Sequence, residues 1–379
     1  MINKIRKIIV NMFYRMFCIL PIQNKVVLAS NSSIILQGNM KYIYEELKSQ
    51  DYNYKTVLLL HDTKNTFNGK LLYLFQMIKG AYHLATSKFF IVDDYYYPIY
   101  IIAPKEETTI IQVWHACGAF KKFGFSVLDK SFGATESFAK NVKIHSNYDY
   151  VLVSTKNVSK IYAEAFNMDI KKIISIGIPR TDIFFNETKK AHITKCLYEK
   201  YPILKDKKII LYAPTFRGNS KFLADNKQLL DFVSMYKKLK DEYVMILKLH
   251  PFVKKSDIFD DNLKDFIVDL SDYDDINELM LISDVLISDY SSVIFEYALL
   301  EKPMFFYAPD LVEYIKERDF YFDYEDFVPG KIIKSTNDLI ISIQNAEYDL
   351  KVIKDFKDYF FDYKDEKSSQ RFIKILLKS

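Results

Sequence analysis

Glycine and proline are scarce in this chain of 379 residues, with nine and ten copies respectively. Hydrophobic residues make up 49% of the sequence. Chains that stay unfolded are poor in apolar residues and rich in proline, glycine and charge, so this composition excludes an intrinsically disordered protein. A chain of this length exceeds what one hydrophobic core usually supports, and we therefore expect two domains.

Cysteine is rarer still, and its three copies, Cys18, Cys117 and Cys196, lie far apart in the sequence. They provide neither a disulfide framework nor a paired metal site, which fits a protein of the reducing cytoplasm. Asp93 and Asp94 are adjacent carboxylates without a third ligand nearby, so they predict a capped turn rather than a metal pair. We expect no metal and no cofactor.

An excess of charge of one sign is also nearly absent, because 53 Lys and Arg residues face 49 Asp and Glu residues and the formal net charge is only +4. For a chain of this length, that value gives no indication of nucleic-acid binding. No apolar run is long enough to span a bilayer, since Asn11 and Arg15 interrupt the run at the start of the chain. A small-residue cleavage site is missing as well, so a signal peptide fits poorly.

Residues 1–24 instead predict an amphipathic helix that ends at Pro21. Its apolar stripe runs from Ile5 to Leu20, and its flanking basic residues are Lys4, Arg6, Lys7 and Arg15. Two interpretations fit this pattern, a helix in the plane of an anionic membrane surface and a helix packed on the protein's own core. We favour the first, which predicts a peripheral protein on the cytoplasmic face of the cell membrane.

From Lys25 onward, short β-branched runs alternate with helical patterns, which predicts an α/β fold with parallel sheets. The alternation of strands and helices pauses between Ile178 and Glu187, and we place the interdomain link there. The two Rossmann-like domains are then expected at 25–187 and 188–379. The second domain is expected to include the C-terminal helices. The predicted strands are 26–29, 56–60, 89–92, 109–113, 150–153, 172–176, 208–212, 244–247, 266–268, 285–287 and 304–306. The predicted helices are 39–48, 227–239, 276–282, 291–300, 336–350 and 368–377.

One stretch, from Ile282 to Glu296, combines an apolar strand, a polar turn and a helix. The turn is Ser288-Asp289-Tyr290-Ser291-Ser292. Free backbone N–H groups at the start of a helix attract phosphate, so this turn fits an anion-binding site. By itself, the same turn fits an ordinary Asp or Ser cap equally well.

Four further motifs accompany it. They are Gln112 to Gly124 with Trp114-His115, Gly177-Ile178-Pro179-Arg180-Thr181-Asp182, Tyr212-Ala213-Pro214-Thr215-Phe216-Arg217-Gly218, and Leu247-Lys248-Leu249-His250-Pro251. From about Lys25 to Gly330, the five motifs resemble, in order, the CDP-glycerol glycerophosphotransferase family of teichoic-acid synthesis. Many members read Trp-His-Gly-x-Pro-Leu-Lys where this chain reads Trp114-His115-Ala116-Cys117-Gly118-Ala119-Phe120-Lys121. That variant looks like the shorter, primase-type members.

The resemblance implies two Rossmann-like domains that face a cleft, as in glycosyltransferases of the B type. The first domain would take the acceptor and the second would bind CDP-glycerol. The implied reaction transfers glycerol phosphate to a hydroxyl of an undecaprenyl-diphosphate-linked sugar and releases CMP. His115 is expected to act as the general base and His250 to assist at the phosphate, although the two roles are interchangeable at this point.

The resemblance also implies a set of substrate-binding residues, whose members lie in the five motifs. They are Trp114, Gly118, Lys121, Arg180, Asp182, Thr215, Arg217, Asp289, Ser291, Ser292 and Glu296. Some have a second interpretation. Lys121 fits a solvated face as well as the acceptor's diphosphate, Arg180 fits an ion pair with Asp182, and Glu296 fits a helix cap as well as a ribose contact.

Other functions remain open. The donor fits CDP-ribitol or another polyol, and the enzyme fits a polymerase that adds many units. A sugar-nucleotide glycosyltransferase of the same fold and a non-catalytic scaffold are alternatives from other classes. The acceptor's sugars and the oligomeric state, including a homo-oligomer, are left open.

Overall fold

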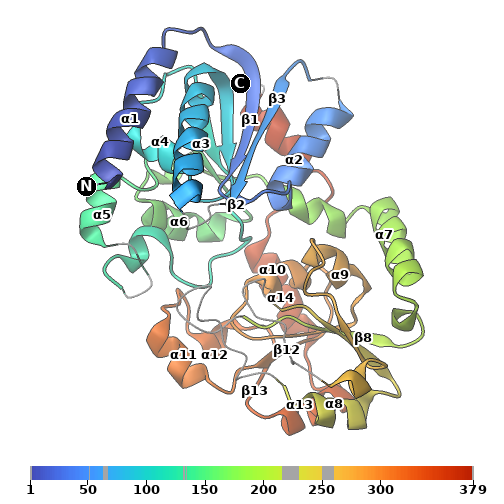
Figure 1. Cartoon of the computed structure of the whole chain (residues 1–379). Helices are drawn as coiled ribbons and strands as arrows, with labels where there is room; N and C mark the ends of the chain where they lie inside the picture. Colours follow the sequence, from blue (N-terminus) through green and yellow to red (C-terminus); the bar gives the residue numbers. More distant parts are fainter. Residues whose placement is uncertain are drawn as a thin grey trace. The chain divides into compact units, whose positions relative to one another are not determined.

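The structure, a computed structural model, describes residues 2–50, 52–62, 67–130, 133, 135–215, 230–249 and 260–377. The chain divides into two compact units, one formed by Met1–Asp182 with Lys367–Ser379 and the other by Ile183–Glu366. Each unit is built on its own mostly parallel sheet with helices packed against it (Figure 1). The predicted α/β class with two Rossmann-like domains is confirmed.

The sheet of the first unit has the strand order β2-β3-β1-β4-β5-β6-β7, and every pair is parallel except β2 with β3. Its strands are β1 (Gln23–Ser30), β2 (Ser32–Ser33), β3 (Lys55–Asp62), β4 (Ser87–Val92), β5 (Thr109–Gln112), β6 (Tyr150–Val153) and β7 (Ile173–Ser175). Its α-helices are α1 (Ile2–Phe17), α2 (Gly38–Ser49), α3 (Phe67–Thr86), α4 (Tyr97–Ile101), α5 (Glu136–Val142), α6 (Ser159–Phe166) and α15 (Ser368–Phe372).

β1 is an interior strand of this sheet and is buried from Lys25 to Ser30. Val27 pairs with Val57 of β3 on one side and with Phe90 of β4 on the other. A strand with neighbours on both sides and helices on both faces is a continuous apolar run rather than an alternating one. This explains why Val26-Val27-Leu28-Ala29 could be recognised in the sequence.

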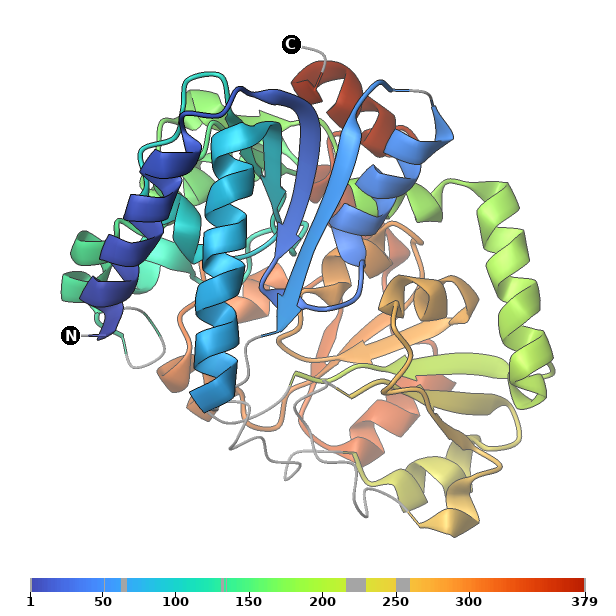
Figure 2. The ribbon, with the colours of Figure 1, turned by 45° about the horizontal axis from the view of Figure 1, so that its top comes forward.

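α1 and α3 lie side by side on one face of the sheet (Figures 1 and 2). Val10 and Tyr14 of α1 are buried, and the ring of Phe17 meets the ring of Tyr82 on α3 edge to face. Asn11 Nδ2 donates to the carbonyl oxygen of Ile101 at the end of α4. One side of α1 is therefore part of the core of this unit.

The C-terminal segment returns to the first unit, whereas the sequence assigned it to the second domain. Asp182 accepts hydrogen bonds from the backbone N–H groups of Ser368 and Ser369 at the start of α15, at 2.8 and 2.9 Å. Arg371 Nε donates to the Ile176 carbonyl oxygen at 2.8 Å. These bonds, together with the burial of Phe372, attach the segment to the first sheet rather than to the second.

The sheet of the second unit is wholly parallel and has the order β10-β9-β8-β11-β12-β13. Its strands are β8 (Lys208–Tyr212), β9 (Tyr243–Leu247), β10 (Ile267–Asp269), β11 (Val285–Ser288), β12 (Met304–Tyr307) and β13 (Lys331–Ile333). Its α-helices are α7 (Glu187–Lys200), α8 (Phe232–Leu239), α9 (Ile276–Ile282), α10 (Val293–Ala298), α11 (Leu311–Glu317), α12 (Tyr324–Phe327), α13 (Thr336–Gln344) and α14 (Leu350–Phe360). The strand order is that of a dinucleotide-binding Rossmann fold.

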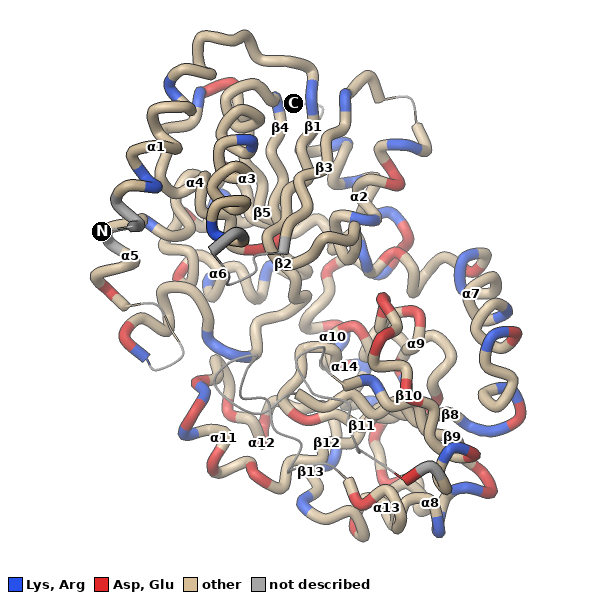
Figure 3. The backbone as a smooth tube through the Cα atoms, in the orientation of Figure 1, with Lys and Arg blue, Asp and Glu red and all other residues tan. Residues whose placement is uncertain are grey.

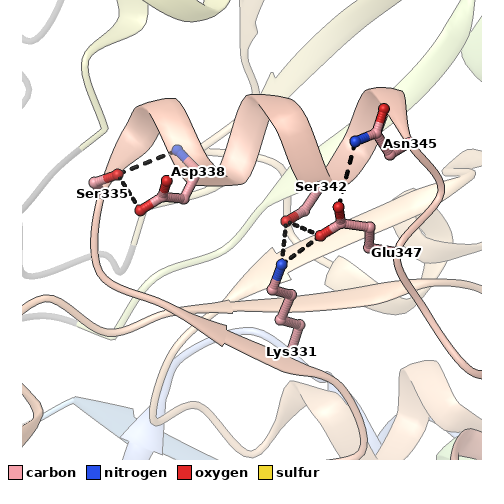
Figure 4. Close-up of polar contacts among 6 residues, drawn as sticks. All are labelled: Lys331, Ser335, Asp338, Ser342, Asn345 and Glu347. Carbon is pink, nitrogen blue, oxygen red and sulfur yellow. Dashed lines mark hydrogen bonds and ion pairs between the residues drawn. The ribbon is translucent and has the colours of Figure 1, made fainter.

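α13 and α14 replace the single helix predicted over 336–350. The Ser335 hydroxyl caps the start of α13 by accepting from Asp338 N at 3.1 Å, and Ala346 ends it with a positive φ of 52°. Beyond the end of α13, the Glu347 carboxylate binds the Lys331 ammonium and the Ser342 hydroxyl (Figure 4). These bonds hold the pKa of Glu347 down at about 2 and join β13 to the turn that separates the two helices.

Lys and Arg alternate with Asp and Glu over both units, as the coloured backbone in Figure 3 shows. On α7, for example, Lys190 lies near Glu187 at 2.6 Å. Among the described residues, no helix is both long and apolar enough to cross a bilayer.

Candidate functional site

The residues of the Trp114-His115 motif lie at the carboxyl edge of the first sheet. The strand order reverses between β1 and β4, because β3 follows β1 on one side and β4 lies on the other. Open α/β sheets bind their ligands outside the carboxyl ends of the strands at such a reversal. Ser30 ends β1, Asp93 follows β4, and β5 leads directly into Val113, Trp114 and His115.

His115 is exposed, and its ring is held from two sides. The ring stacks on the indole of Trp114, with centroids 4.4 Å apart and planes 27° apart. Nδ1 lies 3.3 Å from the backbone carbonyl oxygen of Asp93. A carbonyl oxygen can only accept, so a hydrogen bond here requires the proton on Nδ1, and in the neutral ring the lone pair then lies on Nε2. This tautomer is suited to taking a proton from a substrate hydroxyl.

Trp114 has an unusual backbone conformation, with φ at 49°. Positive φ is strained for a bulky side chain and persists only where the surroundings hold it. Trp114 N donates to Gln112 Oε1 at 2.9 Å, and its buried indole packs against the rings of Phe123 and Phe166. The packed indole thus supports one face of the exposed His115 ring.

Asp93 offers a second titratable group at this edge. Burial, opposed by the hydrogen bond with Ser30 and assisted by the charge of Asp94, raises the pKa of its carboxyl to about 6. Its Oδ1 is buried without a hydrogen-bond partner in the part of the chain that the structure describes. Asp94 Oδ1 accepts from Tyr95 N at 2.6 Å in the segment that follows β4.

Three other residues of the motif have different surroundings. The Gly118 carbonyl oxygen accepts from the Tyr162 hydroxyl at 3.1 Å, which fixes the loop to α6. Cys117 is fully buried, and its Sγ lies 3.9 Å from Arg180 Nη2, so solvent does not reach the thiol. Lys121 is half-buried on the segment that follows.

The side chains of Arg180 and Asp182 both bind groups of the protein itself. Arg180 Nη1 donates to the His115 carbonyl oxygen at 2.9 Å. Asp182 is buried on the N-terminus of α15, and burial raises the pKa of its carboxyl despite the hydrogen bonds from Ser368 and Ser369. Both side chains therefore have structural partners within the first unit.

In the second unit, the strand order reverses between β8 and β11, and two predicted site residues meet there. Asp289 Oδ1 accepts from Thr215 N at 2.8 Å and from Tyr290 N at 2.6 Å. The Asp289 carbonyl oxygen accepts from the Tyr324 hydroxyl at 3.1 Å. This nearly fully buried carboxylate links the ends of the two strands at the edge where ligands of such sheets bind.

The turn after β11 holds the other predicted residues of this unit. Ser291 and Ser292 are half-buried at the start of α10, and Ser291 Oγ accepts from Val293 N at 3.5 Å. Glu296 lies on α10 and is only 3% exposed, so its carboxylate is not a solvated surface charge.

His250 and Arg217 lie outside the residues that the structure describes. The two residues before His250, Lys248 and Leu249, are nevertheless held by hydrogen bonds. Lys248 Nζ donates to the Ser271 carbonyl oxygen at 2.8 Å, and Leu249 N donates to Ser271 Oγ at 3.0 Å.

Sequence reasoning missed two residues that contact the His115 loop, Asn39 and Gln112. Both are buried polar side chains, and Asn39 Nδ2 donates to the Trp114 carbonyl oxygen at 2.9 Å. One signal was visible for Gln112, a single amide inside an otherwise apolar strand. No such signal marked Asn39, because a polar residue near the start of a helix is common.

The model of one protein family, described as CDP-Glycerol:Poly(glycerophosphate) glycerophosphotransferase, matches residues 12–378. The chain belongs to this family. It is 44% identical to the teichoic acid ribitol-phosphate primase of Bacillus spizizenii, over 93% of this chain and 91% of that protein. It is also 44% identical to the poly(ribitol-phosphate) polymerase of the same organism, but spans only 59% of that longer protein. Identity to the glycerol-phosphate primase of Bacillus subtilis is 32%, over 90% of each chain.

The fold agrees with this membership. A solved structure of the wall teichoic acid polymerase TagF superposes with a TM-score of 0.79 at 25% identity, covering 100% of this chain and 98% of that one. The protein is therefore a transferase of the family that makes the polyol-phosphate parts of teichoic acids in the cell wall.

Proposed function

We propose that this glycerophosphotransferase-family protein transfers a polyol phosphate from a CDP-alditol to a hydroxyl of an undecaprenyl-diphosphate-linked sugar. The observation that carries the proposal is the His115 ring, which is exposed at the carboxyl edge of the first sheet, one strand beyond its switch point, with Nδ1 3.3 Å from the Asp93 carbonyl oxygen. Such a ring can take a proton and needs no metal or cofactor to do so.

In this reaction the acceptor hydroxyl attacks the phosphorus that carries the alditol. A new phosphorus–oxygen bond forms, the bond to the CMP oxygen breaks, and the hydroxyl proton passes to Nε2 of His115. Phosphoryl transfer depends mainly on positioning and on neutralising charge. His250 and Arg217 are the residues that we assign to the phosphate oxygens, as the family motifs suggest.

We assign the donor to the second unit and the acceptor to the first. Support comes from the strand order of the second unit, which in other proteins binds nucleotides at its switch point. Thr215 and Asp289 lie at that point, and Ser291 and Ser292 follow it. Glu296 is our candidate for the ribose hydroxyls. Trp114, Gly118 and Lys121 are assigned to the acceptor side.

Ribitol is the alditol that we favour, since the relatives named for ribitol phosphate share 44% identity and the glycerol-phosphate primase shares 32%. Glycerol is the second candidate because the family model bears the name of CDP-glycerol. The chain spans 91% of the ribitol-phosphate primase, so a primase that adds one unit is the preferred form.

The test is to incubate the full chain with a short-chain lipid-diphosphate sugar and either CDP-ribitol or CDP-glycerol. CMP release and the mass of the product are measured. One ribitol phosphate added is the expected result, and a ladder of products would indicate a polymerase. Turnover only with UDP-sugars would identify a glycosyltransferase instead, and no turnover with any donor would favour the scaffold.

The acceptor is bound to a membrane, and we propose that α1 and α3 bring the protein to it. α1 exposes Ile5, Ile8, Met12 and Met16 on the side away from Val10 and Tyr14, and α3 exposes Leu71, Leu72 and Phe75 beside it. Arg6, Lys7 and Arg15 supply positive charge along α1. An apolar face with basic flanks is the pattern of a helix that lies on anionic lipid, here on the cytoplasmic face.

A further inference from the structure

Three consecutive carbonyl oxygens around His115 are held by two side chains from distant parts of the chain. Asn39 Nδ2 donates to the Val113 and Trp114 oxygens at 3.1 and 2.9 Å. Arg180 Nη1 donates to the His115 oxygen at 2.9 Å. The backbone that carries the His115 ring is thereby held by hydrogen bonds at three consecutive carbonyl groups.

The two side chains are also joined to each other. Asn39 Oδ1 accepts from the backbone N–H of Arg180 at 3.2 Å, so the Asn39 amide uses both its donor and its acceptor in this network. Asn39 is 2% exposed, where an amide without partners would be costly. Asn39, near the start of α2, thus links the His115 loop to the Gly177–Asp182 loop.

The strained conformation of Trp114 explains why such a network is needed. A bulky residue with positive φ stays in that conformation only if its neighbours hold it. The Trp114 carbonyl oxygen is one of the two that Asn39 holds, and the adjacent His115 nitrogen must stay within reach of Asp93 O. A small rotation at Trp114 would carry the His115 ring away from that oxygen.

We propose that Asn39 and Arg180 are positioning residues that hold the His115 ring and its Nδ1–H tautomer in place. The inference rests on the proposed function, in which His115 is the base. It gives Arg180 a role other than the phosphate contact expected from its motif. Only an amide fits the position of Asn39, because the site needs a donor to two carbonyl oxygens and an acceptor for an N–H group.

Asn39→Asp is the sharpest variant, since it keeps the shape of the side chain but turns an oxygen toward the two carbonyl oxygens. Arg180→Lys is the second variant and remains informative if Asn39→Asp fails to fold. Misplacing a catalytic group by about 1 Å costs on the order of 100-fold in rate. We expect kcat to fall by about 10-fold to 100-fold, with donor affinity from calorimetry changed by less than about twofold.

A readout independent of turnover is the histidine ring ¹⁵N spectrum of the full chain, in which His115→Ala identifies the His115 signals. We expect the Nδ1–H form in the unsubstituted chain and a mixture of tautomers in Asn39→Asp and Arg180→Lys. Asn147→Ala is the matched control, because Asn147 Nδ2 also donates to two carbonyl oxygens, those of Ile99 and Ile102, at 2.7 and 3.0 Å. It should leave the His115 signals unchanged.

The outcomes separate the two proposals. Folded Asn39→Asp and Arg180→Lys with unchanged His115 signals and unchanged kcat would overturn the positioning role. If the signals changed while His115→Ala retained full turnover, the positioning role would stand and the proposed base would be wrong. In the His115→Ala background, Asn39→Asp should cause no further loss of residual turnover, because a positioning residue acts only through His115.

Discussion

The His115 ring combines exposure to solvent with a fixed proton, and these two properties come from different neighbours. Trp114 stacks beneath the ring, and the Asp93 carbonyl oxygen defines which nitrogen carries the proton. An exposed imidazole without such partners would rotate and exchange between tautomers. At this position, the neighbours therefore favour the Nδ1–H form of the ring, which the proposed general-base role requires.

His115→Ala should lower turnover by about two to four orders of magnitude, the usual contribution of a general base. Donor affinity should be nearly unchanged, because the base acts on the acceptor hydroxyl rather than on the nucleotide. CMP release and calorimetry with the CDP-alditol measure the two quantities. His192→Ala, which removes an exposed histidine of α7, is the control and should leave both as they are. Near-normal turnover in His115→Ala would remove this residue from the mechanism.

Lys25 is a buried charge at the other end of the first sheet. Its ammonium donates to Thr86 Oγ1 at 2.6 Å and lies 5.0 Å from the ring centroid of Tyr82. Burial, together with the charge of Lys55, lowers the pKa of Lys25 to about 8. Between about pH 8 and the ordinary lysine value near 10.4, the unfolded chain binds the proton more readily than the folded protein does.

Stability should therefore rise as the pH increases through that window. Lys25→Met removes the buried charge, so it should raise the melting temperature at pH 7 and flatten the rise above pH 8. Thermal melts of both proteins at pH 7, 8, 9 and 10 measure this difference. A matched control is Lys88→Met, which replaces a lysine on the neighbouring strand β4 that is only half-buried. If Lys25→Met lowered the melting temperature at every pH, the ammonium would be stabilising.

Residue roles could be predicted from the sequence only in part. The motifs identified the segments that meet at the two switch points, including Asp289, but they did not distinguish a ligand contact from a structural one. Arg180 and Asp182 were expected at the substrate, and the structure shows their bonds to the His115 oxygen and to α15. These partners lie far away in the sequence, and no local pattern reports them.

Among the elements, strands were easier to predict than helices. The buried parallel strands are short β-branched runs, so β1, β4, β8 and β11 were found within a few residues of their ends. α3 was missed because apolar residues occur nearly all around it and Gly80 interrupts its pattern. α14, with three aromatic residues and three lysines, was missed although its apolar residues follow a helical period.

α1 has one buried and one exposed face, and substitutions can separate their contributions. Ile8→Asn, Met12→Asn and Met16→Asn together alter only exposed side chains, so Val10 and Tyr14 stay packed against the first unit. Removing three apolar side chains, each worth on the order of 1 kcal/mol at a membrane, should abolish sedimentation with anionic vesicles. Activity on a vesicle-borne acceptor should fall, while activity on a water-soluble analogue should be retained.

The control for α1 is the pair Ile341→Asn and Val352→Asn, which alters similarly exposed apolar residues on α13 and α14. This pair should sediment like the unsubstituted chain. Vesicle binding that survives the three α1 substitutions would mean that another surface, such as the exposed residues of α3, is sufficient.

At the scale of the whole molecule, each unit repeats one plan, a mostly parallel sheet with its candidate site residues at or next to a reversal of strand order. His115 lies one strand beyond the β1–β4 reversal, and Asp289 lies at the β8–β11 reversal. The sequence predicted the two domains from their alternation of strands and helices. It could not predict that 367–377 returns to the first unit, because the bond between Asp182 and Ser368 joins residues 186 positions apart.

That return should depend on Asp182. Asp182→Ala leaves the buried N–H groups of Ser368 and Ser369 without an acceptor, which should cost about 1–3 kcal/mol of stability in the first unit. We expect a lower melting temperature and faster proteolytic cleavage within 367–377, located by mass spectrometry. Asp231→Ala, which removes the exposed cap of α8 in the second unit, is the matched control and should leave that cleavage rate unchanged. Equal protection of 367–377 in the two variants would show that the buried apolar side chains of the segment hold it without Asp182.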